Sequence, residues 1–159
     1  MLSLAAPLCA QSTTLTVSST TLTYVSPVVA DYTAGFICAG SVTVTATAAA
    51  TSRRDSLFVR LTSAAAIPSN VAGVTKALAD YQWNTNAAGC TATTGWAAVP
   101  GQTSAPALLG FMTYVNTSFN RQVFFRLLLN WATDRGGATY TLPNLRFFVN
   151  RPTAIPAPP

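Results

Sequence analysis

The chain of 159 residues has the length of a single domain, and it carries 8% charged residues with a formal net charge of +5. It contains no histidine, so it lacks the usual base of serine and cysteine triads and the imidazole ligand of metal sites, and all its acids are aspartates. Abundant threonine, with one lysine and no glutamate, favours strands over helices, and we expect a non-enzymatic β protein that needs no cofactor.

Residues 1–10 (MLSLAAPLCA) are short and apolar and end in a small residue, which is typical of the last part of a secretory signal peptide. We expect cleavage after Ala10 and a secreted or cell-surface protein. A lipoprotein anchored through Cys9 is the less favoured alternative, because Pro7 and Leu8 form a poor approach to a lipidated cysteine. No later stretch has the roughly 18 uninterrupted apolar residues of a transmembrane segment, so none is predicted.

Residues 11–25 form an N-terminal strand segment. Leu15 and Val17, and then Leu22 and Tyr24, alternate with threonine and serine. This period of two is typical of strands with one buried face. Because the segment precedes the rest of the domain, we predict that its strand 13–17 is donated to a neighbouring molecule. All four side chains are predicted assembly residues, and Leu15 and Val17 are expected to fill the acceptor groove.

The next segments alternate between connections and strands. Residues 26–40 contain a proline and two glycines and predict a connection that carries Cys38. Strands are predicted at 41–47 and 56–62, on either side of a polar turn. The segment 64–76 fits a short helix or a loop, and 78–83 predicts a strand.

A polar loop at 84–95 contains Cys90, and a short element at 96–99 precedes a second loop at 100–106. If Cys9 leaves with the signal peptide, Cys38 and Cys90 remain as an even pair in an oxidising compartment, and we predict one disulfide between them. The alternative is two separate buried thiols. A metal site is disfavoured, because two cysteines without histidine fall short of four ligands.

Apolar runs at 111–115 and 123–131 predict strands of the interior, and Trp131 is expected in the core. The sequence Asp134-x-Gly-Gly between two strand-like runs predicts a hairpin. Tyr140 follows this turn, and its hydroxyl is expected to point back at it.

Two further features lie near the end of the chain. Pro143 cannot donate to a ladder, so its strand is expected at an edge or a bulge. The proline-rich residues 151–159 predict a stiff, solvated tail.

The charged residues give little sign of a site. Asp55, Asp80 and Asp134 each lie near a predicted turn, where aspartate commonly bonds its own backbone. The arginines are spread along the chain, and only Arg53 and Arg54 are adjacent, so we predict no nucleic-acid partner. Lys76 lies in no S-x-x-K pattern.

These elements predict an all-β sandwich of about eight or nine short strands with one disulfide, with residues 26–150 as its body. The alternating threonine-rich N-terminus (13–25), the single cysteine pair, the low charge and the closing segment from Trp131 to Tyr140 carry a resemblance. The chain resembles bacterial secreted immunoglobulin-like modules and, more loosely, pilus subunits of the chaperone–usher kind. The resemblance implies a sandwich that lacks a strand and accepts an N-terminal one from the next molecule.

Two functions follow as hypotheses. The first is a non-enzymatic extracellular structural subunit of a filament, pilus or surface layer, a homo-oligomer or polymer assembled by strand donation. The second is a secreted glycan-binding module in which Trp96, beside a loop, stacks on sugar rings. A hydrolase is a third and least favoured hypothesis.

Overall fold

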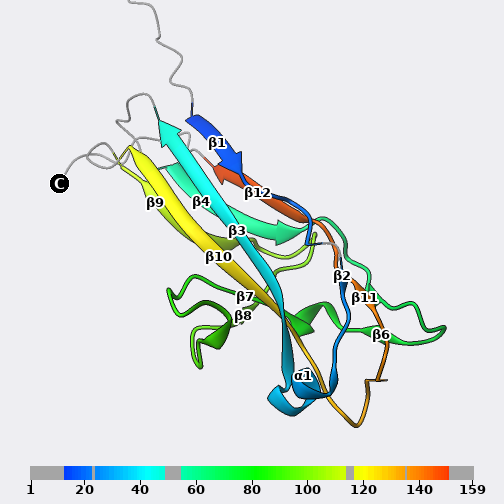
Figure 1. The fold of residues 1–159 in the computed structure, drawn as a ribbon. Coiled ribbons are helices and arrows are strands. Elements are labelled where there is room, and N and C mark those ends of the chain that lie inside the picture. The colour runs from blue at the N-terminus through cyan, green and yellow to red at the C-terminus, as the bar shows by residue number, and fades with distance from the viewer. Residues whose placement is uncertain (1–12, 23, 49–54, 114–116, 135, 151–159) are drawn as a thin grey trace, which may run out of the picture.

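The computed structural model describes residues 13–22, 24–48, 55–113, 117–134 and 136–150 (Figure 1). The expected signal remnant at 1–10 and the proline-rich tail at 151–159 lie outside the described residues. Within the described ranges the chain forms twelve strands, one short α-helix and two short 3₁₀ helices. None of these helices has the length and hydrophobicity needed to span a membrane.

The strands in chain order are β1 (Thr13–Val17), β2 (Tyr24–Val25), β3 (Phe36–Ala48), β4 (Asp55–Leu61), β5 (Ile67–Pro68), β6 (Thr75–Lys76), β7 (Tyr81–Asn84), β8 (Ala97–Ala98), β9 (Ala107–Met112), β10 (Ser118–Leu128), β11 (Tyr140–Thr141) and β12 (Leu145–Asn150). The helices are α1 (Val29–Ala34), η1 (Leu78–Asp80) and η2 (Gly89–Thr91).

The two main sheets form a sandwich. A five-stranded sheet has the order β1-β3-β10-β7-β8, and a three-stranded sheet has the order β12-β4-β9. The long strands β3 and β10 lie in front of β4, β9 and β12 in Figure 1. Two small pairs, β11-β2 and β5-β6, complete the described sheets. The predicted all-β sandwich with one disulfide is confirmed.

The core lies between the sheets and follows the alternation of the sequence. In β4 every second residue is buried, beginning with Asp55 and continuing with Leu57, Val59 and Leu61. The opposing sheet contributes buried apolar side chains from β3 and β10. They are Val42, Val44, Ala46, Val123, Phe125 and Leu127. Because successive side chains of a strand point to opposite faces, the residues between these positions lie on the outer face of each sheet.

Residues 26–40 are not the connection that the sequence predicted. They form α1 and the first five residues of β3, and a bulge at Gly40 interrupts the pairing of β3 with β10. Gly40 has a φ of 116°, which side chains other than glycine rarely adopt. The extra residue reverses which face the strand presents, so Cys38 lies on the outer face, opposite Arg126.

The predicted closing hairpin is wrong. The turn after β10 leads to β11, which pairs with β2 rather than with β10. The physical reason is that β3 and β7 already occupy both edges of β10. Pro143 lies between β11 and β12, where the chain passes from one sheet to another, so no ladder hydrogen bond of a strand is lost.

Trp131 is also not in the core. Its side chain is 56% exposed, and its ring centroid lies 4.6 Å from that of Tyr32. β10 ends at Leu128, and Trp131 belongs to the following turn, in which the Asp134 N–H donates to the Asn130 carbonyl at 2.9 Å. The apolar run therefore extends beyond the strand that it predicts.

Candidate functional site

The N-terminal strand β1 lies at the edge of the five-stranded sheet of its own chain. It pairs with β3 in antiparallel register, from Thr13 opposite Ala48 to Val17 opposite Val44. Leu15 and Val17 pack against the core, whereas Thr14 and Thr16 are exposed. The alternation predicted for this segment is therefore present, and β1 completes one side of the sandwich.

A buried carboxylate fixes the end of β1. The Thr13 hydroxyl donates to Asp55 Oδ2 at 2.7 Å, and Asp55 is fully buried at the start of β4. Asp55 is the first residue of β4, and its contact with Thr13 is one that the sequence did not predict. This contact joins the two sheets and gives β1 a defined register.

The other two predicted assembly residues lie beyond β1. Leu22 packs against the core from an irregular segment, close to Gly40. Tyr24 begins β2, which pairs with β11. The segment 11–25 therefore contributes to two different sheets rather than forming one continuous donor strand.

A second edge was not predicted from the sequence. β9 pairs with β4 on one side, and its Leu108 and Phe111 side chains are 49% and 43% exposed. A shallow depression of about 420 Å³ lies here between β9 and β10. Across it, Arg121 Nη1 donates to the Leu109 carbonyl at 3.5 Å, and the guanidinium lies 5.5 Å from the Phe119 ring centroid.

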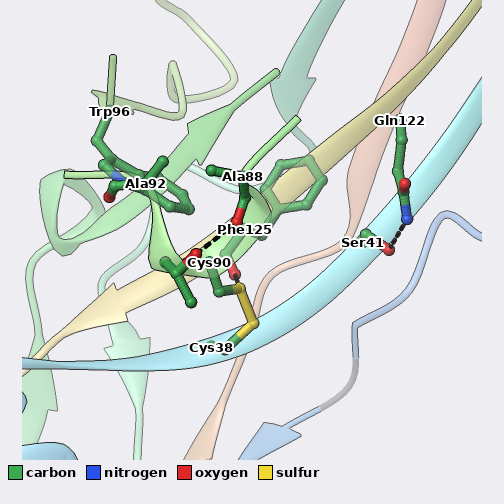
Figure 2. Close-up of a disulfide and its surroundings, with 9 residues drawn as sticks. Cys38, Ser41, Ala88, Cys90, Ala92, Trp96, Gln122 and Phe125 are labelled. Carbon is green, nitrogen blue, oxygen red and sulfur yellow. Dashed lines mark hydrogen bonds between the residues drawn. A yellow bond between two sulfur atoms is a disulfide. The ribbon is translucent and has the colours of Figure 1, made fainter. Parts of the chain in front are cut away.

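Cys38 and Cys90 form the predicted disulfide, with their Cα atoms 5.8 Å apart (Figure 2). The bridge holds the loop around η2 against the outer face of β3 and β10. In this loop Gly89 comes so close to the Phe124 ring that an added Cβ would lie 3.0 Å from it. The alternative of two separate thiols is excluded.

Trp96 lies beside this bridge, and both its indole N–H and its ring already contact other residues of the chain. Its indole N–H donates to the Ala92 carbonyl at 2.8 Å. The Arg126 guanidinium lies 4.3 Å from the Trp96 ring centroid and 4.9 Å from that of Phe36. Burial lowers the pKa of Arg126, whose Nε–H also donates to Gln82 at 2.9 Å.

A charged cluster forms around Lys76 from residues that sequence reasoning did not bring together. Lys76 Nζ lies 2.6 Å from Asp134 Oδ2 and 3.3 Å from Asp80 Oδ2. Asp134 Oδ2 also accepts the Asn130 N–H at 2.7 Å, so this aspartate does bond its own turn, as predicted. The one sequence feature that could have indicated this cluster is the spacing of Lys76 and Asp80 by four residues.

The structure therefore separates the predicted site residues. β1 and Trp96 lie toward opposite edges of the five-stranded sheet, since Trp96 directly precedes β8. In the part of the chain that the structure describes, no three His, Cys, Asp or Glu side chains are grouped so as to hold a metal ion.

Comparison of the chain with protein-family models, curated proteins and solved structures finds no match. The resemblance to immunoglobulin-like modules and pilus subunits stays a prediction from the sequence.

Proposed function

We propose that the chain is a non-enzymatic extracellular structural subunit, of a filament, pilus or surface layer, whose copies assemble by exchanging β1. The observation that carries the proposal is the position of β1 as an edge strand in a fully defined register with β3. An identical strand from a neighbouring copy would reproduce the same pairing.

The contacts of β1 are those that a donated strand needs. Its ladder with β3 supplies main-chain hydrogen bonds, which give affinity. Leu15 and Val17 on the inner face, with the Thr13 to Asp55 hydrogen bond, specify the register. Exchange requires that the chain after β1 take another path, which would release Leu22 from the core.

The remaining features agree with an extracellular setting. The Cys38–Cys90 disulfide would persist outside the cell, whereas cytosolic thiols are kept reduced. The exposed apolar side chains Leu108 and Phe111 on the β9 edge are typical of a surface that another copy covers.

Paired cysteine substitutions test the exchange directly. One protein carries Thr14→Cys and a differently tagged one carries Thr47→Cys, both with Cys9→Ser. These two exposed positions face each other in the ladder. Their Cα atoms are therefore about 4.5–5.5 Å apart, within the range of a disulfide. If β1 is exchanged, mild oxidation of the mixture gives a covalent dimer of the two tagged chains.

The matched control replaces Thr47→Cys with Thr43→Cys, because Thr43 lies four residues further along β3 and is out of reach of position 14. This mixture should give only background dimer. The proposal is refuted if both mixtures give the same yield of covalent dimer while the Thr14→Cys/Thr47→Cys double variant bridges efficiently within one chain. That result would show that β1 stays with its own chain.

The glycan-binding alternative gains less support. Arg126 covers one face of Trp96, and the indole N–H is bonded to Ala92. Both contacts fit a packing role, in which Trp96 holds the disulfide loop on the sheet. Glycan-array binding by a monomeric protein, abolished by Trp96→Ala, would instead favour the alternative.

A further inference from the structure

Lys76 is the only lysine in a chain that otherwise uses eight arginines as its cations. Its side chain is 4% exposed, so it does not serve solubility. Arginine forms ion pairs with better geometry, and its guanidinium stays protonated. A lysine amine differs in one chemical respect, since it is a nucleophile once it loses a proton.

The nucleophile lies against an electrophilic carbon. Lys76 Nζ is 2.6 Å from Oδ2 of Asp134, whose side chain is 5% exposed. The carboxyl carbon is one C–O bond further, so it lies at most about 3.8 Å from the nitrogen. This separation is close to the roughly 3–3.5 Å of reacting atoms in near-attack geometry.

Neighbouring groups supply what acyl transfer needs. The Asn130 N–H donates to Asp134 Oδ2 at 2.7 Å and so holds the carboxyl group in its orientation toward Lys76. The Tyr140 ring centroid lies 5.8 Å from Lys76 Nζ and forms an aromatic wall. Asp80 Oδ2, 3.3 Å from the same nitrogen, is positioned to accept and return a proton.

We propose that Lys76 and Asp134 react with each other to form an intramolecular amide bond. A proton passes from the ammonium to the Asp134 carboxylate, giving a neutral amine and a neutral acid. The amine lone pair then attacks Cγ, and the new C–N bond gives a tetrahedral intermediate.

The intermediate collapses with the help of Asp80. The nitrogen gives a proton to the Asp80 carboxylate, and Asp80 returns a proton to the departing hydroxyl, which leaves as water. One ammonium and one carboxylate become one amide and one water, and Asp80 is unchanged. Lys76 and Asp80 line a cavity of about 290 Å³, and the Asp80 side chain is 32% exposed, which gives the water a route to solvent.

The amide would interlock with the disulfide. One bond closes the chain from residue 38 to 90 and the other from 76 to 134, so the two closed segments overlap. The disulfide joins β3 to η2, and the amide would join β6 to the turn that follows β10. This cross-link stands independently of strand exchange, because all its groups belong to one copy.

Mass spectrometry of the reduced, full-length protein tests the proposal. The expected mass is lower than the mass calculated from the sequence by one water molecule. After trypsin digestion, the bond after Lys76 should stay intact, and a branched peptide should join residues 61–121 to residues 127–135. The branched peptide separates the amide from other water losses, such as a cyclised aspartate.

Two variants complete the test. Lys76→Arg keeps the positive charge and should show the calculated mass with no branched peptide. The Asp80→Asn protein is dissolved from aggregates in denaturant, refolded, and followed by mass over time. It should lose water roughly 100-fold more slowly than wild-type protein treated in the same way. Equal rates of water loss would show that Asp80 takes no part in the reaction. A folded wild type with the calculated mass and cleavage after Lys76 would show an ion pair only and overturn the proposal.

Discussion

Tyr81 buries a hydroxyl that finds no hydrogen-bond partner among the described residues. Burial raises the pKa of Tyr81 above its ordinary value of 10.0. The folded protein therefore binds this proton more tightly than the unfolded chain does. The resulting contribution to stability is complete below pH 10 and is lost as the pH rises through and beyond 10.

Tyr81→Phe tests both parts of this argument. Removing a buried, unpaired hydroxyl should raise the free energy of unfolding by about 1 kcal/mol at neutral pH. Near pH 11 the variant should gain roughly a further 1 kcal/mol over the wild type, because its ring cannot ionise. Urea unfolding at both pH values measures the difference. A variant that is less stable at neutral pH would mean that the hydroxyl is bonded.

Gly110 of β9 lies directly against the Phe119 side chain of β10. A Cβ atom there would lie 2.5 Å from Cε2 of the Phe119 ring. Gly110→Ala should therefore lower the free energy of unfolding by about 1–3 kcal/mol, because Phe119 must leave its place between β9 and β10. Gly136→Ala is the matched control, since nothing lies within 4 Å of its added Cβ. Thermal unfolding should show a loss only for Gly110→Ala, and equal effects would contradict the close contact.

Among the elements, the loop around η2 depends on the disulfide for its place on the sheet. The bridge spans a sequence separation of 52, for which chain entropy gives about 4 kcal/mol. The double variant Cys38→Ser/Cys90→Ser should lose stability of this size in urea unfolding. Cys9→Ser, which removes a cysteine outside this bridge, is the control and should leave stability unchanged. A loss below about 1 kcal/mol would mean that Trp96 and Phe124 hold the loop without the bridge.

Element prediction succeeded where one local pattern is sufficient. β4 follows its apolar alternation along its whole length, and β1 does so over Leu15 and Val17. The start of β3 was missed because the bulge at Gly40 interrupts that alternation. The two-residue strands, such as β6, carry no period at all and exist because the tertiary fold places Lys76 opposite Ile67.

On the scale of the whole molecule, the sequence could not bring Lys76 and Asp134 together. They lie 58 residues apart in a chain whose turn after β10 was expected to close a local hairpin. The contact arises only because β10 is enclosed by two neighbours and its turn continues to β11 instead. The same long-range arrangement exposes the β9 edge, which local patterns described only as an interior strand.

Strand exchange makes a prediction about mixtures of whole molecules. A chain that lacks residues 11–18 keeps β3 as an acceptor but has no β1 to donate, although it loses the Thr13 hydrogen bond to Asp55. Each truncated copy should therefore terminate an assembly. Light scattering should show that the mean mass of full-length assemblies falls as truncated protein is added.

A peptide of residues 11–18 provides the control. It should bind the truncated chain and suppress its capping activity, because the peptide fills the edge of β3. The same peptide with Leu15→Asp and Val17→Asp should fail, since both side chains pack against the core and a carboxylate there would be buried without a partner. The contrary outcome is that the truncated protein binds the peptide and yet leaves the mass of the assemblies unchanged. In that case the edge of β3 can accept a strand, but copies do not join there. The exposed Leu108 edge of β9 would then be the next surface to alter.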